Sequence, residues 1–573
     1  MKKLLLLTVL LVLNSSLFAQ SWLWGAIGDT ATTSNYSIAT DANGDVYQSG
    51  YFFYTVKFGT KSVTSVSGDG YLVKSDKSGK VLWAVQTNAS TPYSSVIPTS
   101  IATDNAGNIF MTGYFADTVV IGSTTLMTKS NATINSSGIC VFLAKFDVNG
   151  NVLWAKEAVQ ASATSHGAAY SVTADKWGNA YITGQFNDTI SFGTHTLRSA
   201  NNDVYTVKYD ANGNVKWAAQ SFALTPASYG GYGYSVTTDK WGNACITGLF
   251  NDTLTFGAYT LKTVVGCDYN VFLVKYDTAG KVLWATQPAS VSNGRGAAYS
   301  VITDNAGAAY IAGYFQDSII FGSYKLSAYV SFGIISDMFL AKYDVGGNVV
   351  WAEQSYNNDS IRKWEGYSLA ADTLNNIYMS AGSYSPGNGK VRFGKDTFSY
   401  TNNNPDPALI LKLDTAGNVK CGTIIPTGGE SNNTVAVTKS GQYIYLGGGI
   451  ADTVAFGKDT FNVPGSGYPF IASWLPCNPV LAEVNNIDDK KGAITVYPNP
   501  SNGIVQLEIT NYELGMKNTI EVYNVLGERV YSQSSILNSP FSINLKDSPA
   551  GVYFIRVYDE GQKFSAITKI IIE

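Results

Sequence analysis

The chain has 573 residues and a formal net charge of −4, and 14% of its residues are charged while 13% are aromatic. This length exceeds one ordinary core, so we expect several domains or an array of repeats. The weakly charged, aromatic-rich composition is typical of a folded β-rich protein and excludes a disordered chain. The small net charge argues against a general nucleic-acid binder or a protein held on anionic membranes.

The first twenty residues read MKKLLLLTVLLVLNSSLFAQ. Two lysines, a short apolar run and a small residue, Ala19, follow one another in the order of a secretory signal peptide, which we place at residues 1–19. The apolar run is short, and no later run of about 18 apolar residues occurs, so we expect no transmembrane segment. No cysteine lies near the expected cleavage site, which argues against a lipoprotein.

A repeated unit fills most of the remaining chain. Its clearest copy, Gly233–Gln287, contains four segments of alternating apolar character: YSVTTD, NACITGLF, NVFLVKYD and KVLWATQ. Their β-branched and aromatic residues predict four strands, a to d. The turns DKWGN and DTAGK supply the Asp or Asn with Gly that tight hairpins need. Seven copies of the first hairpin begin at Asp41, Asp104, Asp175, Asp239, Asp304, Asp372 and Thr438.

Seven units of four strands predict a β-propeller over residues 20–477. A two-sheet sandwich and an open β-solenoid are the alternatives. The ends of the array favour a ring, because the seventh unit stops after strand c and the stretch SWLWGA near the N-terminus looks like an isolated strand d. We therefore expect Trp22–Ala26 to pair with Phe470–Leu475, so that the first strand completes the last unit and leaves no free edge.

The phrases VTADKWGNAYITG and FLVKYDTAGKVLWA resemble the SBBP repeat, which forms seven-bladed β-propellers in secreted bacterial proteins. The resemblance covers roughly residues 21–477. It implies the fold and almost nothing about a ligand, because the family has no common catalytic motif.

A polar linker is expected at residues 478–490. After it the sequence changes to short segments of alternating apolar character with Pro and Gly turns, which predict a small β-sandwich at residues 491–573. The stretches YPNPSNG, VYNVLGERV, LKDSPAGVYFIRV and KIIIE resemble the C-terminal sorting domain of type IX secretion. That resemblance implies that the type IX machinery exports the chain to the outside or the outer-membrane surface of a Gram-negative bacterium. It also implies removal of the tail and, in many cases, attachment to lipopolysaccharide. An ordinary Fn3-like ligand-binding module is the alternative.

The connections between strands predict where a ligand would bind. Turns a–b and c–d share one face and are short, whereas the d–a and b–c connections share the other face and vary, so recognition is expected on the varied face. The candidate binding residues are Tyr93, His166, His195, Tyr229, Tyr232, Arg295, Arg362 and Trp364. Solvated loops without a ligand are the alternative. A metal or acid–base role for the two histidines lacks a supporting motif, and we expect no cofactor and no metal.

Two further sequence patterns lead to predictions. Strand a repeats a small hydroxyl residue near the axis, for which packing is the favoured role: Ser37, Ser100, Ser171, Ser235, Ser300, Ser368 and Thr434. Asp-Ser/Thr-apolar after strand b is explained by turn capping. It also resembles the O-glycosylation sequon of bacteria with type IX secretion, with Thr118, Thr189, Thr253, Ser318 and Thr453 as candidate acceptors.

Two predictions concern side-chain pairs. Cys421 stands where other units place a strand d tryptophan, and an exported chain meets an oxidising compartment, so we predict a Cys421–Cys477 disulfide, with a buried free thiol as the alternative. Six units share an Asp after strand a and a Lys in strand c, and the seventh has neither. We predict an Asp–Lys ion pair in each of the six. The Asp that follows each Lys is a rival partner, and a lysine reaching solvent is the alternative.

No GxSxG, HExxH, P-loop or GxGxxG motif in a suitable setting supports an enzyme. We therefore expect a secreted or surface propeller that acts in binding, adhesion or scaffolding, with a glycan, protein or matrix ligand and no nucleic acid. The alternative is a polysaccharide-degrading hydrolase or lyase on the same scaffold. A carboxylate cluster at one end of the channel would favour the enzyme, and an aromatic-rich face would favour binding.

Overall fold

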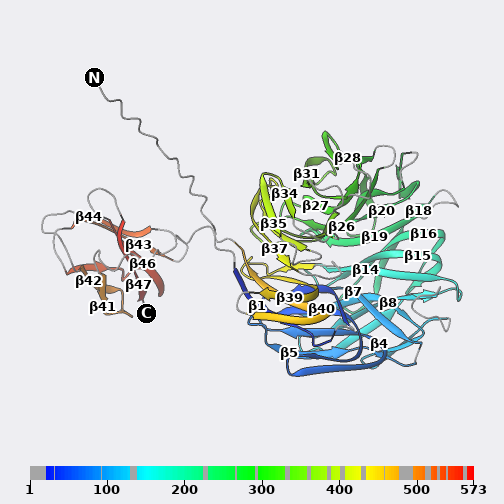
Figure 1. Cartoon of the computed structure of the whole chain (residues 1–573), viewed down its shortest axis with the longest axis horizontal. Helices are drawn as coiled ribbons and strands as arrows, with labels where there is room; N and C mark the ends of the chain where they lie inside the picture. The colour runs from blue at the N-terminus through cyan, green and yellow to red at the C-terminus, as the bar shows by residue number, and fades with distance from the viewer. Residues whose placement is uncertain are drawn as a thin grey trace, which may run out of the picture. The chain divides into compact units, whose positions relative to one another are not determined.

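The computed structural model of the chain is all-β and divides into two compact units, residues 1–477 and 478–573 (Figure 1). It describes residues 21–30, 33–91, 93–129, 138–223, 230–264, 268–290, 294–328, 336–357, 363–383, 389–400, 407–426, 434–456, 459–476, 494–509, 518–524, 529–536, 540–558 and 564–572. The expected signal peptide and linker lie outside these residues. Within them, no helix is long and apolar enough to cross a membrane.

The first unit contains seven antiparallel sets of four strands, here called sheets 1 to 7. Sheets 1 to 3 consist of β2 (Thr33–Thr40), β3 (Val46–Phe58), β4 (Lys61–Ser75) and β5 (Val81–Gln86); β7 (Ser95–Thr103), β8 (Ile109–Ala116), β11 (Cys140–Phe146) and β12 (Val152–Glu157); and β14 (His166–Ala174), β15 (Ala180–Phe192), β16 (His195–Tyr209) and β17 (Val215–Gln220). Sheets 4 and 5 consist of β19 (Gly231–Thr238), β20 (Ala244–Phe250), β23 (Asn270–Tyr276) and β24 (Val282–Thr286); and β26 (Arg295–Thr303), β27 (Ala309–Gln316), β30 (Asp337–Tyr343) and β31 (Val349–Asn357). Sheets 6 and 7 consist of β32 (Trp364–Ala371), β33 (Ile377–Ser383), β36 (Pro407–Leu413) and β37 (Val419–Pro426); and β38 (Thr434–Val437), β39 (Ile444–Phe456), β40 (Asp459–Leu475) and β1 (Ser21–Ile27).

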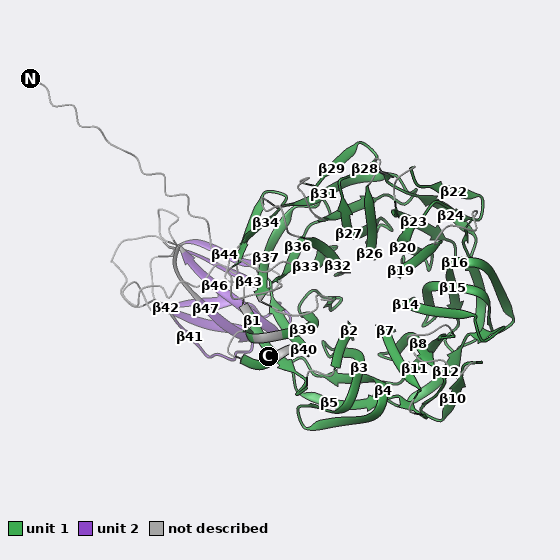
Figure 2. Ribbon diagram, turned by 45° about the vertical axis from the view of Figure 1, so that its right-hand side comes forward, with its two compact units in different colours: residues 1–477 green, residues 478–573 purple. Residues whose placement is uncertain are grey.

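These sheets stand around a common axis, with the first strand of each nearest the centre (Figure 2). The N-terminal strand completes sheet 7 as expected. β1 pairs antiparallel with β40, with Trp22 opposite Trp474 and Ile27 opposite Phe470. The expected pairing of Trp22–Ala26 with Phe470–Leu475 is therefore confirmed.

A tryptophan in the fourth strand joins six of the seven sheets to the next. The Trp217 indole nitrogen donates a hydrogen bond to the Thr278 carbonyl oxygen at 3.0 Å. Its ring lies on Gly280, whose φ is +85° and where a Cβ atom would come within 2.7 Å of the ring. Both the turn and the neighbouring ring thus require glycine. The same bond joins Trp24 to Lys77, Trp83 to Val148, Trp154 to Ala211, Trp284 to Val345 and Trp351 to Thr415.

The predicted Asp–Lys pairs form within the sheets. The Lys275 ammonium lies 2.9 Å from the Asp239 carboxylate, both buried. The other oxygen of Asp239 accepts the backbone N–H groups of Trp241 and Asn243, which closes the turn. Equivalent pairs are Lys74–Asp41 at 3.3 Å, Lys145–Asp104 at 3.2 Å, Lys208–Asp175 at 4.0 Å and Lys342–Asp304 at 3.7 Å.

Sheet 6 departs from this pattern, because the Lys412 ammonium lies over the Tyr378 ring, 5.6 Å from its centroid, and reaches Asp372 through charge alone. Five of the six predicted pairs are thus confirmed at 4.0 Å or less. The rival Asp residues are occupied elsewhere. Asp210, for example, accepts backbone N–H groups of Asn212 and Asn214 and caps its own turn.

The small hydroxyl residues of the first strands do more than pack, which corrects the expectation from sequence. The Ser235 hydroxyl oxygen accepts a hydrogen bond from the Val301 backbone N–H of the next sheet at 3.1 Å. Matching bonds run from Ile101 to Ser37, Val172 to Ser100, Val236 to Ser171, Leu369 to Ser300 and Val435 to Ser368. At the closure of the ring, Thr434 has no partner for its hydroxyl among the described residues.

The connections between second and third strands are regular hairpins, not the irregular loops expected from their variable sequences. Separate hairpins are β9 (Thr118–Ile121) with β10 (Thr124–Met127), β21 (Thr253–Phe256) with β22 (Tyr259–Lys262), β28 (Ser318–Phe321) with β29 (Tyr324–Ser327) and β34 (Gly389–Phe393) with β35 (Asp396–Tyr400). In sheets 1, 3 and 7 the second and third strands simply extend to form them. The chain enters several hairpins through an Asp in the left-handed region, such as Asp188 at φ 57°, which Asp tolerates better than most residues.

Each hairpin of sheets 1 to 6 also joins two neighbouring sheets. The chain leaving one fourth strand pairs with the hairpin of the next sheet through the short strands β6 (Asn88–Ala89), β13 (Val159–Gln160), β18 (Phe222–Ala223) and β25 (Ala289–Ser290), and through the end of β31. After β1, Gly28 bridges Phe58 in the same manner. The junction between sheets 7 and 1 therefore has the contacts of the other junctions, although its strands come from opposite ends of the repeat array.

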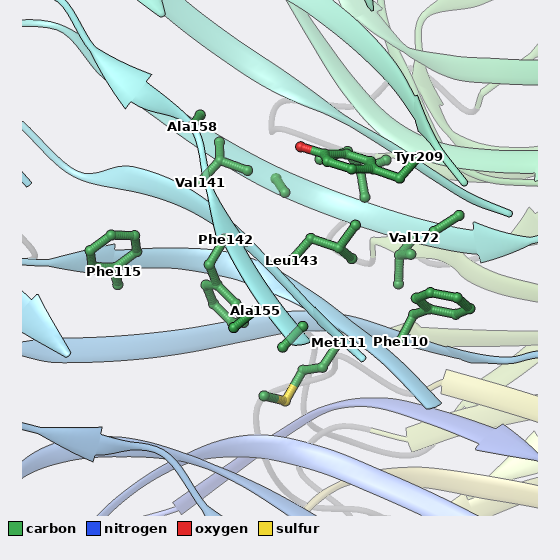
Figure 3. Packing of buried hydrophobic residues seen from close by; sticks show 14 of the residues in the cluster. Phe110, Met111, Phe115, Val141, Phe142, Leu143, Ala155, Ala158, Val172 and Tyr209 are labelled. Carbon is green, nitrogen blue, oxygen red and sulfur yellow. The ribbon is translucent and has the colours of Figure 1, made fainter. Parts of the chain in front are cut away.

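Apolar side chains fill the space between adjacent sheets. Figure 3 shows Leu143 of β11 beside Val172 of β14 and Tyr209 of β16, so that residues of sheets 2 and 3 belong to one buried cluster. Burying large side chains between sheets is the main favourable contribution to folding.

The second unit has two sheets that share one core. They are β41 (Ile494–Tyr497), β42 (Ile504–Ile509) and β45 (Phe541–Asn544), and β44 (Arg529–Ile536), β43 (Asn518–Asn524), β46 (Gly551–Tyr558) and β47 (Phe564–Ile572). Both contribute to the same cluster, for example through Leu507 and Ile555, which are fully buried. This unit thus forms a core separate from that of the ring.

Candidate functional site

A cavity of about 400 Å³ lies on the axis of the ring, lined by the first strands of sheets 1 to 7. One bulge in the first strand of each of sheets 1 to 6 builds its wall. In β19 the pairing register shifts between Gly233 and Ser235, so Tyr234 has no partner across the strand and lines the cavity. A bulge inserts an extra residue and re-aims its side chain. The residues at this position are Tyr36, Thr99, Tyr170, Tyr234, Tyr299 and Tyr367.

Four of these tyrosines form a continuous arc from sheet 3 to sheet 6. The ring centroids are 5.6 Å apart between Tyr170 and Tyr234, 5.4 Å between Tyr234 and Tyr299, and 5.7 Å between Tyr299 and Tyr367. The last two rings are stacked, with 19° between their planes. Burial raises the pKa of Tyr170 and of Tyr234, so both keep their hydroxyl proton. The arc therefore offers aromatic surface together with hydroxyl donors.

Glu365 of β32 also lines the cavity, and it is the one carboxylate among the described lining residues. The Tyr367 hydroxyl lies 3.3 Å from its carboxylate and donates a hydrogen bond to it. Burial raises the pKa of Glu365. Hydrogen bonds from Tyr367 and Tyr299 and the charge of Lys363 offset this effect only in part.

Two predicted binding residues lie beside this cavity. Tyr232 stacks on Tyr234, with ring centroids 6.0 Å apart and planes 29° from parallel. Arg295 forms an ion pair with Asp268 and lowers the pKa of Tyr314, while burial and Glu365 raise it. Both residues therefore lie next to the tyrosine arc, at the start of the strands that carry Tyr234 and Tyr299.

The remaining predicted residues do not join this group. Trp364 is fully buried in the core of sheet 6 and packs against Tyr400, so it cannot contact a ligand, and its proposed place on the binding face is wrong. Tyr93 lies in the β6–β7 connection and is 63% exposed. Tyr229 and Arg362 lie outside the described residues.

The two histidines do not form a pair. His166 is opposite Asn187 on β15, whereas His195 is opposite Phe192 at the tip of the outer hairpin. Five residues of strand separate these levels, or roughly 15 Å, so the side chains cannot share a metal or a proton. Among the described residues, no group of three or more His, Cys, Asp or Glu side chains is arranged to hold a metal ion.

The candidate acceptors for O-glycosylation differ in exposure. Thr453 is exposed, Thr118 and Thr189 are half-buried, and Thr253 and Ser318 are buried at 9% exposure each. Cys421 is disulfide-bonded, and its expected partner Cys477 lies outside the described residues. Cys140 and Cys245 are free and buried.

A second cavity, of about 380 Å³, lies at the opposite end of the first strands. Its lining includes Asp41 and Asp104, which are already paired with Lys74 and Lys145. Lysines of the same sheets thus neutralise these carboxylates. This cavity therefore has fewer charged groups free to bind a ligand than the tyrosine-lined cavity.

Sequence reasoning missed the tyrosine arc. The signal was present, because Tyr36, Tyr170, Tyr234, Tyr299 and Tyr367 each precede the repeated serine directly. In a regular strand, alternation would turn such a tyrosine away from the face that its neighbour occupies. The bulge allows both residues to line the cavity, and no local sequence feature predicts the bulge.

Comparisons with known proteins support this architecture. Residues 82–114 match the family model of a β-propeller repeat, and residues 495–573 match that of a secretion-system C-terminal sorting domain. The chain therefore contains a β-propeller repeat and a C-terminal sorting domain. Its sorting domain further makes it a cargo of type IX secretion, exported to the surface or the surroundings of a Gram-negative cell.

An uncharacterised WD repeat-containing protein of Acanthamoeba polyphaga mimivirus is 27% identical over 240 residues, which span 35% of this chain and 16% of the relative. The chain thus covers less than a fifth of that protein. Among solved structures, a copper-bound fungal alcohol oxidase covers 96% of this chain and 99% of its own, with 12% identity and a TM-score of 0.36. A DUF4221 family member from Bacteroides vulgatus covers 63% and 91%, with 12% identity and a TM-score of 0.28. These scores transfer no function.

Proposed function

We propose that residues 21–477 form a complete seven-bladed propeller that acts as an extracellular glycan-binding module, delivered by the type IX sorting domain. The observation that carries this proposal is the axial cavity with its arc of tyrosines. Stacked aromatic rings beside hydroxyl donors suit the apolar faces and hydroxyl groups of sugars. A cavity of about 400 Å³ falls within the usual size of small-ligand sites.

The alternative of a polysaccharide-degrading enzyme has less support. Glycoside hydrolysis usually needs two carboxyl groups facing each other across the scissile bond. Among the described residues, the cavity wall offers Glu365 alone. Binding without turnover is therefore the function that fits this wall better.

A glycan array probed with the secreted full chain tests the proposal. We expect binding that falls about fivefold in the Tyr299→Ala variant, because each aromatic contact is worth roughly 1 kcal/mol. Tyr324→Ala is the matched control, since Tyr324 lies on the outer hairpin β29 and is 38% exposed. Equal losses in both variants, or no glycan bound by the wild type, would overturn the proposal.

A further inference from the structure

Glu365 is a half-buried carboxylate that lines the axial cavity, unlike the buried Asp69 and Asp203, which also have no described lysine beside them but accept hydrogen bonds from nearby hydroxyl and backbone N–H groups. The turn carboxylates of sheets 1 to 5 each have a lysine within 4.0 Å. For Glu365, no lysine, arginine or histidine of the described chain lies within that distance, and its polar contacts are tyrosine hydroxyls. Because burial disfavours an unpaired charge, a cavity carboxylate with no cation within that distance among the described residues can serve as the counter-ion of a cationic ligand.

The aromatic wall beside Glu365 attracts positive charge as well. Tyr299 and Tyr367 donate hydrogen bonds to the carboxylate, and their stacked rings continue the arc to Tyr234. The negative face of an aromatic ring draws a cation placed within about 6 Å of its centre. The sheets already show this preference, since the third-strand lysines of sheets 1, 2, 3, 5 and 6 lie over rings, as Lys208 does at 4.9 Å from the Tyr181 centroid.

We propose that the axial cavity recognises an amino sugar through its free ammonium group, with Glu365 as the counter-ion and Tyr299 and Tyr367 as the aromatic walls. This inference rests on the glycan-binding function proposed above and names the chemical class of the ligand. Several charged or titratable groups surround the site. Tyr299, Tyr367 and Lys363 act on Glu365 itself, and Glu365 and Arg295 act on Tyr314.

A neutral sugar fits this wall less well. An amide or hydroxyl in the same place would leave the ionised carboxylate without a charge partner in a half-buried site, which costs more than the hydrogen bond returns. An ammonium group donates up to three hydrogen bonds and carries the missing charge. The wall therefore discriminates by charge more than by shape.

The test compares two sugars that differ by one acetyl group. Glucosamine and N-acetylglucosamine are titrated into the full secreted chain at about pH 7, because a more acidic buffer would protonate Glu365, whose pKa burial raises, and calorimetry is the readout. We expect glucosamine to bind at least about tenfold more tightly, as an ion pair supported by aromatic faces implies. In Glu365→Gln the preference should disappear while the weak binding of N-acetylglucosamine stays unchanged.

Two variants make the test specific. Tyr299→Phe keeps the ring and removes the hydroxyl, so it should retain most of the preference for glucosamine. Glu353→Gln removes another half-buried glutamate whose carboxyl does not line the cavity, and it should leave both affinities unchanged. Thermal unfolding of each variant shows that the fold persists.

The outcomes separate this inference from the function on which it rests. Equal affinity for both sugars, or a Glu365→Gln variant that keeps the preference, would overturn the ammonium site while glycan binding stands. A chain that binds neither sugar but binds n-butylammonium in a Glu365-dependent manner would support the cation site and reject the glycan. A chain that binds none of the three probes would reject both.

Discussion

The indole nitrogen of Trp217 donates a hydrogen bond to the carbonyl oxygen of Thr278, and its ring covers Gly280 in the same turn. The repeat segment that contains Trp217 thus provides the hydrogen-bond donor, and the segment that contains Gly280, in the next sheet, provides the carbonyl acceptor. Because each copy of the repeated sequence carries both the tryptophan donor and the acceptor turn, repeating this one short sequence is sufficient to join neighbouring sheets. That explains why the chain repeats it with so little change.

Closure of the ring by the N-terminal strand leads to the first prediction. Deletion of residues 20–28 removes β1, exposes the edge of β40 and should destabilise the whole first unit, because Trp24 is buried and bonded to Lys77. The single change Trp24→Ala should lower stability by about 3–5 kcal/mol. Chemical unfolding followed by tryptophan fluorescence measures both. Leu23→Ala, at a position that is 42% exposed, is the control, and unchanged stability after the deletion would refute the role of β1.

The second prediction concerns the serine bonds between first strands. Ser235→Ala leaves the Val301 N–H without its acceptor and should cost roughly 1–3 kcal/mol. Thr434→Val is the control, because the Thr434 hydroxyl has no partner among the described residues, and it should change stability by less than about 0.5 kcal/mol. Urea unfolding midpoints of the two variants decide the matter, and equal effects would show that the serines only fill space.

The third prediction tests the ion pair of Asp239 and Lys275. Lys275→Met leaves a buried carboxylate unpaired and should destabilise by about 3–5 kcal/mol, whereas the double variant with Asp239→Asn should recover much of the loss. Both are compared by urea unfolding in a double-mutant cycle. A double variant no more stable than Lys275→Met alone would argue that the lysine acts through packing.

The fourth prediction follows from the pKa of the same carboxyl. Burial raises the pKa of Asp239, but hydrogen bonds from Asn243 and Lys275 outweigh this effect, and the pKa ends below its ordinary value. A carboxyl with a lowered pKa stabilises the fold above its ordinary pKa and loses that contribution as the pH falls through its folded value. Unfolding midpoints measured from neutral pH to about pH 2 should therefore fall less steeply for Asp239→Asn than for the wild type. Parallel curves would contradict the shift.

The fifth prediction concerns Cys421, which is opposite Lys412 in the register where Trp351 is opposite Lys342. Sheet 7 receives its fourth strand from β1. It therefore has no turn between its third and fourth strands that could accept a hydrogen bond from a tryptophan of sheet 6. We predict that peptide mapping without reduction recovers Cys421 linked to Cys477, with Cys140 and Cys245 as free thiols. Cys421→Ser should then lower stability by about 2–4 kcal/mol under oxidising conditions and have a much smaller effect in reductant. Recovery of Cys421 with another partner would reject the pairing.

Strand pairing and ion pairs could be predicted because they follow the repeat. The loss of both charges in the seventh unit, at Thr438 and Ser473, indicated that Asp and Lys interact, and the isolated Trp24 indicated how the ring closes. The outer hairpins were missed because their lengths differ, although the recurring Asp-Thr and Phe-Gly steps, as in Asp188 and Gly193, mark both ends of each. The cavity wall was missed for a physical reason, since a one-residue bulge changes where Tyr234 points without changing the local composition.

The outer hairpins have a consequence for an exported protein that must remain separate from its copies. In sheets 1 to 5 the tip of the hairpin packs on the fourth strand of its own sheet, as Gly193 does beside Val215 and Gly257 beside Val282. The Arg198 N–H of one hairpin is bonded to the Gln220 side chain of the fourth strand. Unpaired strand edges are the usual starting point for polymerisation of β-proteins. These hairpins cover the edges of the fourth strands. A second chain outside the cell therefore finds little exposed backbone with which to pair at the rim of the ring.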